Sequence, residues 1–185
     1  MNAEEALNRL LEGNKRYVSG KLAEKDVGSA REATKGAQKP FVTILTCSDS
    51  RVVPEFIFDA NVGELFVIRN AGNVVDDIVL GTIEYGAEHL GTPLFVVLGH
   101  EKCGAVTAAC SGGDCPPNIA AIVSRIKPAK AKGGDVEEVV LHNMRNVAEE
   151  IRSGSEIVRH LEKEGRLKIV EMKYFFEDGR VEIKK

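Results

Sequence analysis

The stretch Phe41-Val42-Thr43-Ile44-Leu45-Thr46-Cys47-Ser48-Asp49-Ser50-Arg51 decides the fold. Its first six residues are apolar or β-branched and lead into Cys47, which is typical of a strand buried on both faces of a sheet. A second run of the same character, Pro93-Leu94-Phe95-Val96-Val97-Leu98-Gly99-His100, is soon followed by Cys103. We predict that the two runs are neighbouring buried strands whose carboxyl ends meet, so that Cys47, His100 and Cys103 lie together.

The rest of the chain alternates between strand and helix patterns. Further strands are expected over 65–68 and 167–176, and a hairpin turn at 177–180 leads into a return strand at 181–183. Helices are expected over 3–19, 54–59 and about 77–90, and after Gly104. Two or three more are expected within 118–164, broken by Pro128, Gly133-Gly134 and Gly154. The helix over 77–90 should turn Ile78, Val79 and Ile83 inward. This order predicts an α/β fold with a mostly parallel central sheet flanked by helices, an N-terminal helical arm and a C-terminal β-hairpin extension.

The first helix carries an apolar stripe that includes Ala6, Leu7 and Leu10, and the polar stretch 20–39 that follows cannot bury it. The helix therefore either folds back on the core or crosses to a second subunit. We divide the chain into residues 1–39, a helix and arm expected to pack on a partner subunit, and residues 40–185, the metal-binding α/β domain.

The totals exclude several classes of protein. The chain of 185 residues has 43% hydrophobic and 29% charged residues, which are values of a globular domain. A net charge of −3 argues against a nucleic-acid partner, and no apolar run approaches the ~20 residues that span a bilayer. The acidic N-terminus does not resemble a signal peptide, so we expect a cytoplasmic protein whose four cysteines stay reduced.

Cys47, His100 and Cys103 are the ligand types that zinc prefers, and three protein ligands leave one exchangeable position, as in catalytic zinc sites. A single turn after the strand can bring His100 and Cys103 to one point. Gly104 should remove side-chain bulk there and begin a helix whose N-terminus favours the Cys103 thiolate. Each residue alone is also typical of a small buried core position. Their shared place at strand ends, where parallel sheets carry their sites, favours one Zn²⁺ per subunit.

Asp49 and Arg51 are spaced so that their side chains point to the same side of an extended segment, and an arginine can bind a carboxylate through two hydrogen bonds. One interpretation is a surface ion pair worth at most ~1 kcal/mol. The other is a gate beside the metal. If Arg51 holds Asp49, the fourth zinc position stays free for water, and if Asp49 swings in, it becomes a fourth ligand and closes the site.

Together these motifs resemble those of the β-class carbonic anhydrases. The resemblance rests on Cys47-Ser48-Asp49-Ser50-Arg51-Val52 and His100-Glu101-Lys102-Cys103-Gly104, and it extends to 11–17, 63–73 and 83–91. Similarity covers about residues 5 to 110. It implies zinc-dependent reversible hydration of carbon dioxide to bicarbonate and a proton, in a homodimer or higher homo-oligomer.

The resemblance also implies roles for single residues. Cys47, His100 and Cys103 would bind zinc, and Asp49 with Arg51 would form the catalytic dyad. The expected substrate contacts, often shared with a partner subunit, are Gln38, which stands nine positions before Cys47, with Phe66, Ala71, Tyr85 and Gly104.

Some positions depart from the family pattern. Ile44 replaces a tryptophan of the second bicarbonate site found in some members, although Arg69 of that site remains, so we predict an enzyme without the bicarbonate switch. The segment 170–174 replaces a Val-His-Gly stretch, which leaves the pairing of that strand open. Cys110 and Cys115 match no motif and are either a second metal site or an ordinary helix residue and a loop thiol.

Two rival functions stay open. The same site could hydrolyse carbon disulfide or carbonyl sulfide, because the selectivity between these substrates depends on the shape of the access path. A non-catalytic zinc protein is the second rival. Asp49, Arg51 and Gln38 argue against it, since a structural zinc site is normally closed by four ligands.

Overall fold

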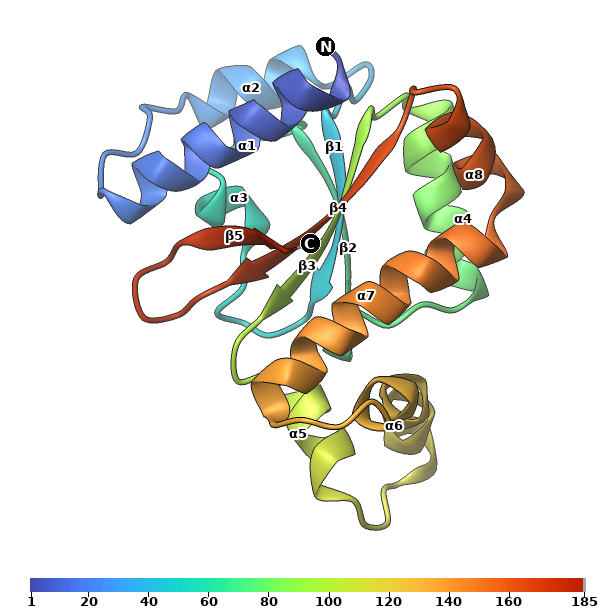
Figure 1. Cartoon of the computed structure of the whole chain (residues 1–185). Coiled ribbons are helices and arrows are strands. Elements are labelled where there is room, and N and C mark those ends of the chain that lie inside the picture. The colour runs from blue at the N-terminus through green and yellow to red at the C-terminus, as the bar shows by residue number, and fades with distance from the viewer. Residues whose placement is uncertain (185) are drawn as a thin grey trace.

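The computed structural model describes residues 1–184, and a five-stranded sheet forms its centre (Figure 1). The strands are β1 (Val42–Cys47), β2 (Leu65–Asn70), β3 (Leu94–His100), β4 (Lys168–Tyr174) and β5 (Val181–Lys184), in the order β2-β1-β3-β4-β5. The first four strands are parallel and β5 runs antiparallel to β4. The predicted α/β fold and its C-terminal hairpin are confirmed. The replaced segment 170–174 pairs with β3 in regular parallel register.

Helices cover both faces of the sheet. They are α1 (Ala3–Val18), α2 (Val27–Ala33), α3 (Pro54–Ile57), α4 (Asp77–Glu84), α5 (Gly104–Ser111), α6 (Pro117–Lys130), α7 (Val136–Gly154) and α8 (Glu156–Lys163). A 3₁₀ turn follows β2 at Ala71–Asn73, and a π-helix follows α4 at Tyr85–His89. No helix within residues 1–184 is both long and apolar enough to cross a membrane.

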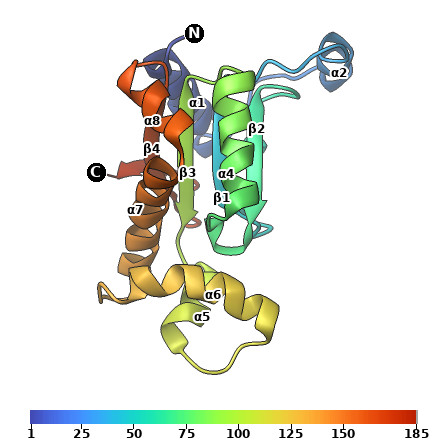
Figure 2. The same ribbon diagram turned by 90° about the vertical axis from the view of Figure 1, so that its right-hand side faces the viewer.

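Alternation along the buried strands divides the core into two clusters. Leu45 and Val97 face α4 to α8, whereas their neighbours Ile44 and Val96 face α1 and α3. Figures 1 and 2 both place α5 and α6 beyond the end of the sheet to which the arrows of β1 and β3 point. This end carries the candidate site.

The first helix folds back on its own chain. Ala6, Leu7 and Leu10 are buried in the same cluster as the sheet residues Ile44 and Val96. Within one chain the helix thus folds back on the sheet. The packing of residues 1–39 on a partner subunit stays a prediction. Because β1 and β3 are apolar on both faces, this second face needs a cover, and α1 provides one.

Asn14 fixes α1 at its other end. Its side chain is buried and donates to the carbonyls of Ile57 (3.1 Å) and Gly179 (2.9 Å), and it accepts from the N–H of Val181 (2.9 Å). One side chain thus ties α1 to α3 and to the C-terminal hairpin.

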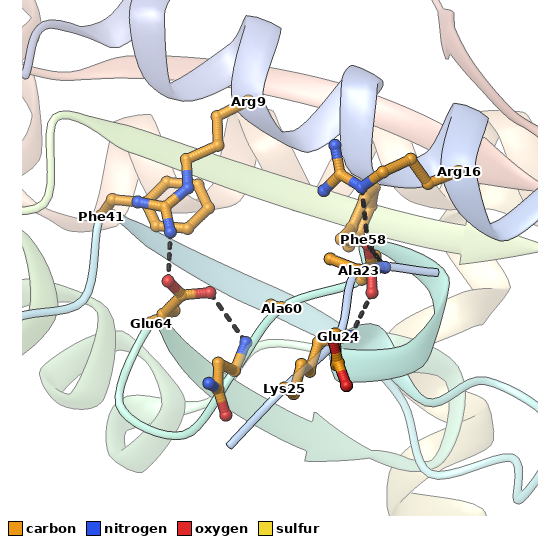
Figure 3. A pocket seen from close by; sticks show the side chains of 11 residues that line it. Arg9, Arg16, Ala23, Glu24, Lys25, Phe41, Phe58, Ala60 and Glu64 are labelled. Carbon is orange, nitrogen blue, oxygen red and sulfur yellow. Dashed lines mark hydrogen bonds and ion pairs between the residues drawn. The ribbon is translucent and has the colours of Figure 1, made fainter. Parts of the chain in front are cut away.

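The arm after α1 is tied to the chain by Asp59, whose side chain is fully buried. Its carboxylate accepts from Arg16 Nε (2.6 Å), from the N–H of Ala23 (2.9 Å) and from Lys25. These groups border a polar cavity of about 220 Å³, into which Arg9 and Arg16 reach from α1 (Figure 3). Short helix α2, which the sequence analysis missed, then begins at an Asp26 cap that accepts from the N–H of Ser29 (2.9 Å).

Two details of the helices differ from expectation. Ile78 is 79% exposed and does not belong to the inner face of its helix. The buried stripe of this helix consists of Val79, Ile83 and Ala87, and Ile78 lies at its margin. Pro128 lies inside α6 and does not end it. It stands in the last turn of the helix, where a proline removes one backbone hydrogen bond.

Candidate metal centre

Two neighbouring strands and one helix bring three buried metal-ligand side chains together. Cys47 is the last residue of β1, His100 is the last residue of the adjacent parallel strand β3, and Cys103 precedes the first turn of α5. Within residues 1–184, the ligand atoms of these three residues form the one set that lies within 4.8 Å of one another. The predicted meeting of the two strand ends is confirmed.

The imidazole of His100 is oriented toward this set. Its Nδ1 lies 2.8 Å from the carbonyl oxygen of Glu101, which makes Nδ1 the protonated nitrogen and leaves the lone pair on Nε2. Nε2 is fully buried and finds no hydrogen-bond partner among the described residues. A buried ring nitrogen with a free lone pair beside two sulfurs fits a metal ion, and the Cys₂His donor set fits zinc.

The two thiols differ in acidity. The pKa of Cys47 is lowered to about 4, chiefly because its sulfur accepts a hydrogen bond from the Cys103 thiol, with a further bond from the N–H of Gly72. The same contact and burial raise the pKa of Cys103. An ion that binds both sulfurs must therefore displace the Cys103 proton, so metal affinity should rise with pH.

Gly72 supports the Cys47 sulfur and was missed by the sequence analysis. Its N–H points at Sγ from 3.3 Å, and its φ of 77° lies in the left-handed region. A Cβ at this position would lie 2.8 Å from Ile126 Cδ1 and 3.0 Å from Ala105 Cβ. The signal in the sequence was a glycine two residues after the end of β2, the strand that pairs with β1.

Asp49 and Arg51 form a two-pronged ion pair beside the set. Arg51 Nε donates to Asp49 Oδ1 (3.0 Å) and Nη2 donates to Oδ2 (2.8 Å). The Arg51 guanidinium is the main reason why the pKa of Asp49 is lowered to about 2. Arg69 donates to the backbone carbonyl of Asp49 (2.9 Å) and so holds the loop as well. The carboxylate is thus held by Arg51, which is the open arrangement of the predicted gate.

The turn between His100 and Cys103 is anchored from α7. Lys102 has a φ of 52°, unusual for a residue with a side chain, and its N–H donates to Glu137 Oε1 (2.7 Å). Lys173 of β4 donates to the other oxygen of Glu137 at 2.5 Å. These contacts join residues far apart in the sequence, and no local pattern marks them.

The residues expected to contact substrate are divided in space. Ala71 directly follows Asn70, the register partner of Cys47, and so lies beside the set. Phe66 pairs with Thr43, four residues before Cys47 and about 13 Å away along the strand. Tyr85 contacts Phe66, with ring centroids 6.0 Å apart. Gln38 is exposed before the amino end of β1. One chain therefore does not bring Gln38, Phe66 and Tyr85 to the metal ligands.

Gly104 begins α5 as predicted. Gly104 is exposed, and a Cβ built there would meet no described atom within 4 Å. Packing within the chain therefore leaves room for a side chain here, and the need for a glycine beside the metal stays a prediction. The benefit to Cys103 comes from backbone hydrogen bonds of Ala105 and Val106, which favour the thiolate. Cys110 and Cys115 are half-buried, unpaired by any disulfide among the described residues, and outside the set.

Comparisons with known proteins show the family of the chain. The family model described as carbonic anhydrase matches residues 42–181. A carbonic anhydrase from Mycolicibacterium smegmatis is 36% identical over 193 aligned residues, which cover 99% of this chain and 94% of the relative. The solved Coccomyxa β-carbonic anhydrase, a complex with acetazolamide, superposes with a TM-score of 0.77 and 27% identity over 96% of this chain and 85% of its own. A tetrameric β-carbonic anhydrase from Sordaria macrospora shares the fold with a TM-score of 0.74 and 24% identity over 82% of this chain and 84% of its own. This chain belongs to the β-class carbonic anhydrase family.

Proposed function

We propose that the protein catalyses the reversible hydration of carbon dioxide to bicarbonate and a proton, with one zinc ion bound by Cys47, His100 and Cys103. The observation that carries the proposal is the buried Cys₂His set, which lies beside the Asp49 carboxylate that Arg51 holds through two hydrogen bonds. A set of three protein ligands keeps one position for the reaction, as catalytic zinc sites do. Family membership supports the choice of carbon dioxide as the substrate.

A zinc ion held by these residues would supply Lewis acidity, which makes hydroxide, the nucleophile for carbon dioxide, available at neutral pH. The chain supplies the remaining functions. Asp49 would accept a hydrogen bond from the attacking oxygen and orient its lone pair, while Arg51 holds the carboxylate in place. The N–H of Gly72 and the first turn of α5 would stabilise the two thiolates.

The substrate pocket would be completed by a second copy of the chain. Gln38, Phe66 and Tyr85 lie away from the metal ligands of their own chain, and Tyr85 is 46% exposed. A homo-oligomer in which these residues face the partner's metal centre would supply the amide donor and apolar wall that carbon dioxide needs. Residues 20–39, the exposed part of the proposed arm, are available for the same contact. We place the protein in the cytoplasm, where the thiols stay reduced.

The proposal is tested by zinc analysis combined with stopped-flow hydration of carbon dioxide. Wild type should bind one zinc per chain and be active, and Cys103→Ser should lose both the metal and the activity. Cys110→Ser, which changes a half-buried thiol outside the set, is the matched control and should keep both. Full zinc occupancy in Cys103→Ser would remove this residue from the ligand set.

Hydrolysis of carbonyl sulfide and carbon disulfide should be measured on the same preparation. Faster turnover of either sulfur compound than of carbon dioxide would reassign the substrate. Zinc bound by four protein ligands at every pH, with no hydration activity, would make the centre structural.

A further inference from the structure

The turn between β4 and β5 covers the metal centre with an aromatic ring. Phe176 lies on this turn, and the guanidinium carbon of Arg51 lies 3.9 Å from the centroid of its ring. The same ring lies 5.4 Å from the imidazole of His100. The N–H of Phe176 donates to Glu101 Oε1 (2.8 Å), so the backbone of the turn is fixed beside the ligand loop.

Arg51 is therefore held on two sides. Its edge binds Asp49 through two hydrogen bonds, and its face lies against Phe176. The Arg51 side chain is 54% exposed, and an ion pair with that exposure is weak and competes with water. A guanidinium over an aromatic face gains a further attraction and loses freedom to rotate away. The contact with Phe176 thus fixes the plane in which Arg51 presents its donors to Asp49.

The neighbouring residue shows that this contact is specific to position 176. Phe175 belongs to the same turn, but its ring lies under Arg180, at 4.0 Å, on the hairpin itself. Of two adjacent aromatic residues, one packs against hairpin cations and the other reaches across to the arginine of the dyad. The two residues therefore provide a test and a control within one turn.

We propose that Phe176 is a positioning residue of the metal centre, which holds Arg51 so that Asp49 stays bound to it and off the metal. The inference rests on the proposed function for its catalytic consequence. Without the ring, Arg51 would sample other rotamers, and the released carboxylate of Asp49 would compete for the fourth metal position. The C-terminal hairpin would then control whether the site is open.

The test compares Phe176→Leu, Phe176→Trp and the control Phe175→Leu. Leucine keeps apolar bulk and removes the aromatic face, whereas tryptophan restores a face that attracts cations. Each protein is loaded with Co²⁺, and its visible spectrum is titrated with thiocyanate, which reports an exchangeable metal position without any turnover. Hydration of carbon dioxide is measured on the zinc forms, and thermal unfolding checks the fold.

We expect Phe176→Leu to bind thiocyanate more weakly and to lose about 2- to 5-fold in kcat/KM, the range of a cation–π contact at an exposed site. Phe176→Trp should recover most of both signals, and Phe175→Leu should resemble wild type. Equal losses in Phe176→Leu and Phe175→Leu, or no rescue by tryptophan, would overturn the proposal.

The same data separate this inference from the proposed function. If wild type binds thiocyanate but does not hydrate carbon dioxide, the proposed function is wrong. Weaker thiocyanate binding by Phe176→Leu would in that case still support the positioning role of Phe176. If wild type is active and Phe176→Leu equals it in thiocyanate binding and in hydration, the positioning role of Phe176 is wrong and the proposed function is unaffected.

Discussion

At the scale of single residues, the charge of Asp49 matters more than its bulk. Its carboxylate is ionised, because Arg51 holds its pKa at about 2, and it lies beside a metal-ligand set to which it does not belong. The pair should therefore stay intact throughout the neutral range.

Asp49→Asn should keep zinc, because the three ligands are unchanged, and lose about 100-fold or more in turnover, the typical contribution of a positioned hydrogen-bonding acid or base. Stopped-flow hydration and zinc analysis measure the two effects. Asp178→Asn is the matched control, because Asp178 and Arg180 form an ion pair on the hairpin, also two positions apart in sequence and 2.5 Å apart in space. Turnover unchanged in Asp49→Asn would make the dyad a surface ion pair.

Near the site, both the backbone conformation and the close packing at position 72 require a glycine. Gly72→Ala puts a side chain at positive φ and a methyl group within 2.8 Å of Ile126 Cδ1. It should lower the free energy of unfolding by about 2 to 4 kcal/mol and weaken zinc binding, since the N–H that supports Cys47 must shift.

Denaturant unfolding and competition with a zinc chelator measure these changes. Gly81→Ala is the control, because Gly81 lies in α4 with open space around it. This variant should raise the free energy of unfolding by about 0.5 to 1 kcal/mol. A Gly72→Ala protein as stable as wild type would show that the loop relaxes freely.

At the scale of elements, the arm depends on a titratable anchor. Arg16, Lys25 and the N–H of Ala23 stabilise the charged form of Asp59, and together they outweigh its burial and lower its pKa to about 2. Because the folded pKa lies below the unfolded value of about 3.9, this anchor stabilises the fold above that pH and is lost as the pH falls through about 2.

Asp59→Asn should therefore lower the free energy of unfolding at pH 7 by about 1.5 to 3 kcal/mol, the value of hydrogen bonds to a charged group. The difference from wild type should shrink between about pH 4 and pH 2. Asp76→Asn, which changes an exposed helix cap, should show a smaller difference. Urea unfolding across this pH range tests the anchor, and a difference independent of pH would contradict it.

The elements differ in how far sequence could predict them. β1 and β3 were predictable, because a strand buried on both faces is a continuous apolar run that can be recognised without knowing its neighbours. The ends of these two runs then located Cys47 and His100. The stripe of α1 predicted a helix but not its partner, since amphipathicity does not say which surface buries it. Phe176 and the contact of Lys102 with Glu137 could not be predicted, because both depend on how β4 and α7 approach a loop distant in sequence.

At the scale of the whole molecule, the separation of Phe66 and Tyr85 from the metal ligands is the feature that one chain leaves unexplained. Both are half-buried or exposed aromatic residues on or next to β2, the edge strand of the sheet. If the partner's copies of these residues complete the pocket, every active site needs two chains, and catalysis should depend on assembly.

Mixing two inactive variants tests this dependence. Cys103→Ser breaks the metal centre, and a Gln38→Ala, Tyr85→Ala double variant breaks the proposed pocket. After unfolding and refolding together in equal amounts, the mixture should recover about a quarter of wild-type activity, because half of the dimers are mixed and each of these has one intact site. Mixing Cys103→Ser with Cys47→Ser is the control and should recover nothing, since every site then lacks a metal ligand. Activity no higher than the sum of the separate variants, with mixed dimers present by native mass spectrometry, would mean that Gln38 and Tyr85 serve the metal centre of their own chain.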